Sequence, residues 1–283
     1  MTKDETTDLV TELRDVVGAL DKGSLEYGAC SGSQEALDRS ILTILYDHET
    51  GRPIAFNALA VMDCTLRGQP VEVLHLGLVV VDPTVQARGF SWVLYGLTTF
   101  LLFFKRRLKP MWLSSVTQVP AVVGMVSESF SGVYPTGNPK GRRTYSHVHL
   151  VREIMDRYRH VFGVGKDAGF DEKRFVITNA YTGGSDNLKK EFDEATKHRN
   201  ERYNELCKAQ LDYERGDDFI QLGRITLRAF WHFLARSVPK RSGAAVMLRM
   251  VYVFLEFLVL PIVQWFSADK PMGELRPWKE DAS

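Results

Sequence analysis

A six-residue turn between two apolar runs has the residue types and spacing of a phosphate-binding site. The run Leu74–Val81 is apolar enough for a buried strand, and after Asp82-Pro83 the chain reads Gln86-Ala87-Arg88-Gly89-Phe90-Ser91 and then a second apolar run. A helix that starts directly after a strand presents unpaired backbone N–H groups and the positive end of its dipole, which together bind anions. Gly89 lets the backbone approach such a ligand, and Arg88 adds charge. In the competing interpretation, Gly89 only permits a tight strand-to-helix contact.

The elements that must position this turn follow the order strand, strand, strand, helix, strand, helix. Strands are predicted at 40–46, 54–62, 71–81 and 111–118, and helices at 85–107 and 120–130. The first three strands are joined by short turns, as in an antiparallel meander. A helix at 146–161 and a strand at 173–181 follow. The sequence therefore predicts an α/β fold with a mixed sheet flanked by helices.

The turn and this order of elements together resemble the GNAT superfamily of acyl-CoA-dependent N-acyltransferases. Members carry a Gln/Arg-x-x-Gly-x-Gly/Ala signature at the start of a helix that follows a long apolar strand. Gln86 and Gly89 match the signature, whereas Ser91 stands where glycine or alanine is usual and is small enough to be tolerated. The resemblance covers roughly residues 40–180 and is strongest over 71–130.

The resemblance implies a binding site for acetyl-CoA or a longer acyl-CoA. The strand before the signature, here Leu78, Val79, Val80 and Val81, would pair through its exposed backbone with the pantetheine arm. The pyrophosphate would lie on the turn formed by Gln86, Ala87, Arg88, Gly89, Phe90 and Ser91. A backbone N–H near the strand centre would stabilise the negative charge that develops on the thioester oxygen.

His75 and Tyr134 are the candidates for the proton transfers that amine acylation requires. In some histone-modifying relatives a carboxylate acts as base at the position of His75, and an imidazole with an ordinary pKa of about 6.5 suits the same task. A core histidine with hydrogen-bonded ring nitrogens is the competing interpretation. A tyrosine commonly protonates the leaving thiolate in this family, but Met125 occupies its position here, so Tyr134, just beyond, is the substitute.

Charge and cysteine content exclude several classes of protein. Lys plus Arg number 36 against 35 Asp plus Glu, and a net charge of +1 argues against broad capture of nucleic acid. Three scattered cysteines make no disulfide framework, and His147 and His149 have no acidic or cysteine partner at ligand spacing, so no metal is expected. The acidic N-terminus does not read as a secretion signal. We expect a cytoplasmic protein, or one held peripherally on the cytoplasmic face of a membrane.

A change of composition near Ser185 divides the chain into an acyltransferase domain, residues 1–185, and a helical extension, residues 186–283. Residues 219–241, capped by Asp217 and Asp218, place cations at four-residue steps among apolar residues, as in a basic amphipathic helix. Residues 244–266 are long enough to cross a bilayer but contain Arg249 and Glu256. Residues 219–266 would lie on an anionic membrane surface, or pack on the core or on a second subunit of a homo-oligomer; a full span is a third alternative.

These patterns favour an acyltransferase that moves an acyl group from acyl-CoA to an amine. The sequence leaves the acceptor open. If a membrane holds the protein, we expect either the acyl chain or the acceptor to be lipid-like. Met125 at the usual position of the acid motivates the alternative of a non-catalytic acyl-CoA-binding or membrane-interface scaffold protein with the same fold.

Overall fold

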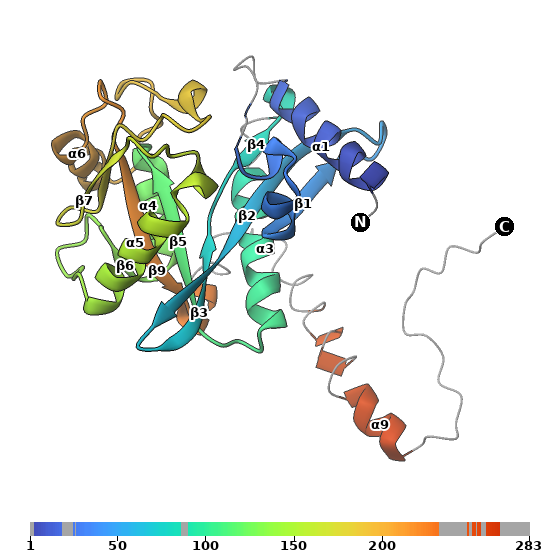
Figure 1. The fold of residues 1–283 in the computed structure, drawn as a ribbon. Helices are drawn as coiled ribbons and strands as arrows, with labels where there is room; N and C mark the ends of the chain where they lie inside the picture. The colour runs from blue at the N-terminus through green and yellow to red at the C-terminus, as the bar shows by residue number, and fades with distance from the viewer. Residues whose placement is uncertain are drawn as a thin grey trace. The chain divides into compact units, whose positions relative to one another are not determined.

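The chain divides into two compact units, Met1–His232 and Phe233–Ser283. A computed structural model describes residues 3–18, 25, 27–85, 90–231, 248, 251–252, 254–255 and 259–266. The first unit contains the sheet and its covering helices (Figure 1). The boundary expected near Ser185 falls inside this unit, because a strand formed by residues 218–225 lies within its sheet.

The order of elements predicted from the sequence is present, with shorter bounds for several elements. The helices are α1 (Lys3–Gly18), α2 (Gln34–Asp38), α3 (Phe90–Lys105), α4 (Pro120–Ser129), α5 (Tyr145–Arg157), α6 (Glu201–Gln210) and, in the second unit, α9 (Leu260–Phe266). The strands are β1 (Ser40–Tyr46), β2 (Pro53–Leu66), β3 (Gln69–His75), β4 (Val79–Val81), β5 (Met111–Thr117), β6 (Ser131–Tyr134), β7 (Gly169–Asp171), β8 (Val176–Thr178) and β9 (Asp218–Ile225).

In the described part of the chain these strands form one mixed sheet. Its main path runs β1-β2-β3-β5-β9-β8-β7, with β4 paired to β2 and β6 paired to β9. The pairing of β3 with β5 is parallel, and the other pairings are antiparallel. The α/β fold with a mixed sheet flanked by helices is therefore confirmed.

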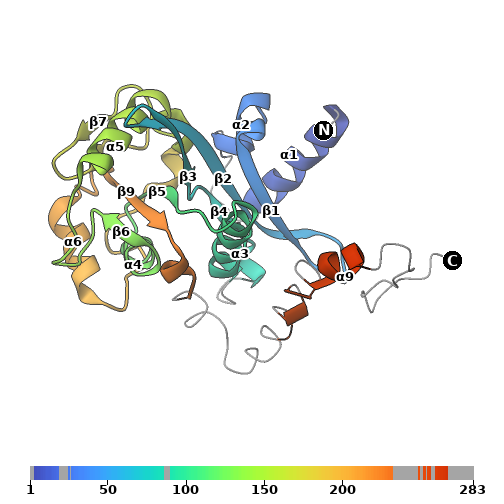
Figure 2. The same ribbon diagram turned by 90° about the horizontal axis from the view of Figure 1, so that it is seen from below.

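Helices cover both faces of the sheet. Side chains alternate between the two faces along a strand, so the neighbours Ala55 and Phe56 of β2 point in opposite directions. Phe56 belongs to a core cluster with Leu13 of α1, and Ala55 to a cluster with Leu94 of α3. Figure 2 shows α1 and α3 on opposite sides of β1 and β2.

The same alternation in β9 places the remaining helices. Ile220 packs in the cluster that contains Leu150 of α5, whereas Phe219 packs with Val123 of α4 and Tyr203 of α6. The α5 cluster also includes Met62, which lies on the same face of β2 as Phe56 because the two are an even number of residues apart. One face is thus covered by α1 and α5, and the other by α3, α4 and α6.

The prediction of an amphipathic helix over residues 219–241 is wrong for its first part. Residues 218–225 form β9, which pairs antiparallel with β5 from Phe219 opposite Thr117 to Ile225 opposite Met111. Apolar side chains are buried on both faces of this strand, as expected for a strand in the middle of a covered sheet.

Part of the expected membrane-facing segment, residues 219–266, lies outside the described residues. Of the range 226–266, the structure describes residues 226–231, 248, 251–252, 254–255 and 259–266. Within the described part of the chain, no helix combines the length and apolar character needed to cross a membrane.

Candidate functional site

The strand that leads into the predicted site contains one extra residue. Ala60 of β2 pairs with His75 of β3, and Asn57 of β2 pairs with Val79 of β4. Over this interval β2 advances by three residues and the opposite strand by four, which defines a β-bulge at residues 76–78. A bulge bends its strand and redirects the backbone groups that follow, and bulges are frequent beside active sites.

Gly77 lies at the centre of the bulge, where only glycine fits. A Cβ on this residue would lie 2.4 Å from the carbonyl oxygen of Ala58, far closer than a van der Waals contact. Two hydrogen bonds hold the bulge in place. The hydroxyl of Tyr95 on α3 donates to the Gly77 carbonyl at 2.6 Å, and the Ala58 N–H donates to the Leu78 carbonyl at 2.9 Å.

Beyond the bulge, β4 separates from β5. The parallel pairing ends at His75 and Ser114, and the Leu76 N–H makes a last hydrogen bond of 2.7 Å to the Ser114 carbonyl. From Val79 onward the described pairing is with β2 alone, and Figure 1 shows β4 beside β2 and apart from β5. The two parallel strands therefore open into a gap within the sheet.

The backbone of Val79 faces this gap. In an antiparallel ladder, successive residues point their N–H and C=O groups alternately toward and away from the partner strand. The hydrogen bonds of Ala58 with Leu78 and of Asp82 with Ile54 place Val80 toward β2 and Val79 away from it. Neither backbone group of Val79 has a hydrogen-bond partner in the part of the chain that the structure describes. Such an edge can pair with an extended ligand.

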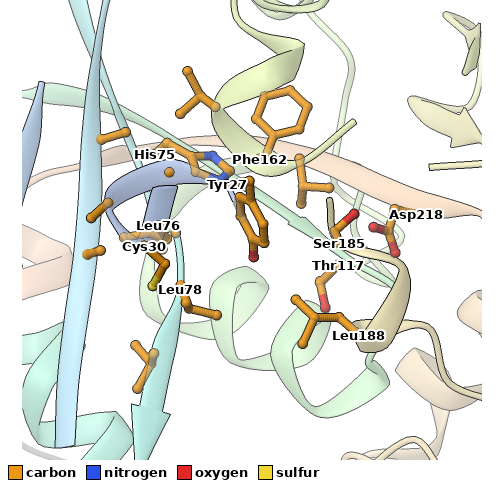
Figure 3. A pocket seen from close by; sticks show the side chains of 18 of the residues that line it. Tyr27, Cys30, His75, Leu76, Leu78, Thr117, Phe162, Ser185, Leu188 and Asp218 are labelled. Atoms are coloured by element: carbon orange, nitrogen blue, oxygen red, sulfur yellow. The ribbon is translucent and has the colours of Figure 1, made fainter. Parts of the chain in front are cut away.

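A cavity of about 270 Å³ occupies the opening. The bulge and the start of β4 form one wall, the end of β5 forms another, and residues of β1, β2, β9 and several loops line the rest (Figure 3). Its polar and ionisable lining residues include Tyr27, Cys30, His75, Thr117, Tyr181, Ser185 and Asp218. The cavity thus combines a free strand edge with several groups that can exchange protons.

Asp218, the first residue of β9, is the carboxyl group of this cavity. Its side chain is 5% exposed, and the Tyr181 hydroxyl donates to its Oδ1 at 3.0 Å. Burial raises the pKa of Asp218 to about 7, although the bond from Tyr181 acts in the opposite direction. The adjacent Asp217 has a different role, because Arg215 binds both of its oxygens at 2.8 and 2.7 Å. A carboxyl group with a near-neutral pKa suits proton transfer at physiological pH.

His75 also lies in the cavity wall, as a buried and hydrogen-bonded side chain. Its Nδ1 is 3.0 Å from the Ser114 hydroxyl, and its ring centroid is 5.1 Å from that of Phe162. Burial lowers the pKa of His75 to about 4. The ring is therefore neutral at physiological pH and accepts a proton less readily than Asp218 does.

Tyr27 and Cys30 bring two protonated groups to the cavity. Burial raises the pKa of the Tyr27 hydroxyl well above its usual value, and it raises the pKa of the Cys30 thiol to about 11. Cys30 therefore carries its proton at neutral pH and is a poor nucleophile. The Tyr27 hydroxyl points into the space between Leu78 and Leu188 (Figure 3). It is positioned to donate a proton to a group bound there.

The structure brings only some of the predicted site residues together. Leu78 and Val79 line the cavity with His75, whereas Val80 and Val81 are buried in two core clusters. The turn residues Gln86, Ala87, Arg88 and Gly89 lie outside the described residues, and Phe90 and Ser91 form the start of α3.

Tyr134 lies on β6 and does not line this cavity. Its hydroxyl donates to the Lys173 carbonyl at 3.2 Å, and its ring packs edge-on against Phe175. Asp218 and Tyr27 line the cavity instead, and neither was identified from the sequence. The sequence pattern predicts Asp218 to be a helix cap, and the pairing of β9 with β5 corrects that prediction.

The chain has little similarity to known proteins. No family model matches it, and no curated protein matches it. Solved structures that match parts of it include a tetramutant of the BH1408 protein from Bacillus halodurans, with 14% identity, a TM-score of 0.22 and coverage of 25% of this chain and 46% of that chain. A mutant of KacT matches with 14% identity, a TM-score of 0.25 and coverage of 29% of this chain and 56% of that chain. AtaTR bound with AcCoA matches with 17% identity, a TM-score of 0.25 and coverage of 30% of this chain and 53% of that chain.

The chain spans about half the length of each of these solved structures. Similarity at this level assigns neither a family nor an activity to the chain. In the described residues, no group of three or more His, Cys, Asp or Glu side chains is arranged to hold a metal ion.

Proposed function

We propose that this chain is a GNAT-like acyltransferase that moves an acyl group from acyl-CoA to a primary amine. The observation that carries the proposal is the opening between β4 and β5, where the backbone of Val79 faces a cavity with ionisable side chains. The pantetheine arm of coenzyme A is an extended chain with two amide groups, so it can pair with a free strand edge as a peptide does. In this proposal the arm pairs with Val79, and the thioester lies beside the bulge at residues 76–78.

The pyrophosphate of the cofactor is assigned to residues 86–91, of which 86–89 lie outside the described residues. This assignment rests on the Gln86 and Gly89 signature in the sequence. The start of α3 at Phe90, a few residues after β4, supports it, because backbone N–H groups at the first turn of a helix favour anions.

The side chains of the cavity have complementary tasks in this reaction. Asp218 takes a proton from the ammonium group of the acceptor, and the free amine attacks the thioester carbonyl carbon. A backbone N–H at the bulge stabilises the oxyanion. The C–N bond forms in this attack. As the C–S bond then breaks, the Tyr27 hydroxyl gives its proton to the leaving thiolate, and the second proton that the nitrogen loses on becoming an amide returns to the Tyr27 oxygen. An ammonium group beside Asp218 would also lower the pKa of that carboxyl group and favour its charged form.

Thiol release tests this proposal. We expect the protein to release free coenzyme A from acetyl-CoA or a longer acyl-CoA when a suitable primary amine is present. Asp218→Asn should lower kcat by about 10²-fold or more, because general-base catalysis contributes on that scale. Calorimetry should show acyl-CoA affinity within about twofold of wild type, because this variant leaves the strand edge intact. Asp167→Asn, a change at an exposed carboxylate outside the cavity, is the matched control.

Met125 on α4 favours one alternative function, a non-catalytic acyl-CoA-binding or scaffold protein. The two functions predict different combinations of results. Tight acyl-CoA binding without thiol release, across amine and lipid acceptors, would favour the binding protein. Absence of binding in calorimetry would contradict both, because each requires the strand edge at Val79 to hold the cofactor.

A further inference from the structure

The outward face of α3 is apolar over three turns of the helix. Within Val93–Phe104, every described side chain that is exposed to solvent is a large apolar one. These side chains are Val93, Leu97, Leu101 and Phe104, which are between 45% and 58% exposed. Steps of four and three residues keep them on one side of the helix. An apolar face of this kind on a water-exposed helix indicates an interaction surface.

A second segment extends this apolar face. Phe230, which follows β9, packs edge-on against Phe100 and Phe104 of α3, with ring centroids 4.9 and 5.1 Å apart. Its neighbours Leu227 and Trp231 are 49% and 54% exposed. We define the α3 surface as Val93, Leu97, Leu101 and Phe104 together with Leu227 and Trp231.

Cationic side chains gather where α3 ends. A cavity of about 490 Å³ at this point is lined by Lys105, Arg106, Arg107 and Lys109, among others. Arg106 forms an ion pair with Glu72. Lys105, Arg107 and Lys109 are exposed and have no carboxylate partner within the described residues. Because the whole chain has a net charge of only +1, this is a local concentration of positive charge.

We propose that the α3 surface, with the cationic cavity at its end, docks on a lipid bilayer that contains anionic lipids. The apolar side chains enter the boundary between head groups and acyl chains, and the three cations approach the phosphates of anionic lipids. An apolar helix face bordered by lysine and arginine is the pattern of interfacial membrane binding. Charge complementarity favours this occupant over an apolar protein surface, because an apolar partner would leave Lys105, Arg107 and Lys109 without counter-charges.

Vesicle flotation of the 283-residue chain tests the proposal. The protein should bind vesicles of phosphatidylcholine mixed with phosphatidylglycerol more strongly than vesicles of phosphatidylcholine alone. Leu97→Glu with Leu101→Glu should weaken binding by roughly tenfold or more, because two apolar side chains no longer leave water. Lys105→Gln with Lys109→Gln should weaken binding to the anionic vesicles by about fivefold per charge removed. Binding to vesicles of phosphatidylcholine alone should stay unchanged.

Two matched controls lie elsewhere on the surface. Tyr145→Glu replaces an apolar ring that is 69% exposed, and Lys140→Gln with Lys166→Gln removes two exposed charges. Neither should change flotation by more than about twofold, since none of these residues belongs to the α3 surface or its cavity. An equal loss in the controls would overturn the proposal, because the loss would then reflect net charge or general surface polarity.

A fluorescent label at position 101 gives an independent reading that does not depend on the charged variants folding. The native cysteines Cys30, Cys64 and Cys207 are buried, so Leu101→Cys offers the exposed thiol for an environment-sensitive dye. The emission should shift to the blue with anionic vesicles and stay unchanged with phosphatidylcholine alone.

Three results would overturn the proposal. In the first, the label at position 101 shows no shift in emission with anionic vesicles. In the second, the variant Leu97→Glu with Leu101→Glu is folded and still binds the vesicles as wild type does. In the third, the chain does not bind vesicles and is a dimer that the same double substitution converts to a monomer, which assigns the α3 surface to a second copy of the chain.

Discussion

Gly77→Ala tests whether the bulge forms the cofactor site, because one added methyl group acts on both the fold and the strand edge. The new Cβ would lie 2.4 Å from the Ala58 carbonyl oxygen, about 1 Å inside the onset of ordinary contact. That oxygen belongs to the backbone of β2, so it cannot rotate away as a side chain would. The bulge must therefore shift, which moves Leu78 and Val79 at the cavity wall.

The magnitude follows from the contacts around Gly77. Overpacking in a well-packed region costs about 1–3 kcal/mol. The shift also weakens the hydrogen bonds that hold the bulge, from Tyr95 to Gly77 and from Ala58 to Leu78, each with a net value of about 1 kcal/mol. We expect the free energy of unfolding to fall by about 2–4 kcal/mol and the urea midpoint to fall by about 1–2 M.

Urea unfolding and calorimetry with acetyl-CoA provide the assay. The folded Gly77→Ala protein should bind acetyl-CoA at least about tenfold more weakly than wild type, because the strand edge is displaced. Gly18→Ala, at the end of α1, is the matched control, since no atom of the described residues lies within 4 Å of its Cβ position, apart from its chain neighbours and the backbone of its own helix. Unchanged stability and affinity in Gly77→Ala would refute the close approach of the bulge to β2. Lost stability with unchanged affinity would refute its role in the cofactor site.

Three further predictions concern the ionisable residues of the cavity. Tyr181→Phe removes a hydrogen bond to the charged form of Asp218 and so raises the pKa of that carboxyl group. The acidic limb of the kcat/KM profile should therefore move up by about one pH unit, and an unmoved limb would argue against Asp218 as the base. Burial lowers the pKa of His75 from 6.5 to about 4, so the stability that depends on its neutral ring is complete above pH 6.5 and falls by up to about 3 kcal/mol as the pH drops toward 4. Urea unfolding of His75→Gln should lack this part of the pH dependence. If wild type and variant lose stability equally with pH, the burial of the ring is contradicted. In the thiol-release assay, Tyr27→Phe should lower kcat by about 10²-fold, whereas Tyr134→Phe should leave kcat within about twofold of wild type. A larger loss in Tyr134→Phe than in Tyr27→Phe would assign the general acid to Tyr134 on β6.

Local patterns were sufficient to predict the elements that surround the site. Alternation and short turns predicted the meander of β1, β2 and β3, and Pro120 marked the first turn of α4. These signals are local, because each depends on residues that are close in the sequence. The long apolar run that became β3 and β4 contains one glycine, Gly77, which is a recognised sign of a bulge or a close backbone approach.

The central strand and the carboxyl group of the cavity could not be predicted in the same way. Arg224 in β9 begins a series of cations at four-residue steps, a spacing that is typical of a helix. Because β9 is buried on both faces, it lacks the alternation of apolar and polar residues that indicates a strand. Its partner β5 is about a hundred residues away in the sequence. The raised pKa of Asp218 depends on this pairing, because burial within the folded sheet, rather than any sequence neighbour, is its largest cause.

A crystal structure of the protein with a non-hydrolysable acetyl-CoA analogue tests the central claim most directly. We predict that the pantetheine arm lies in the opening between β4 and β5, with an amide hydrogen-bonded to the backbone of Val79 and the acyl carbon beside Asp218. A complex in which the analogue binds elsewhere, with Val79 still facing an empty opening, would contradict the claim.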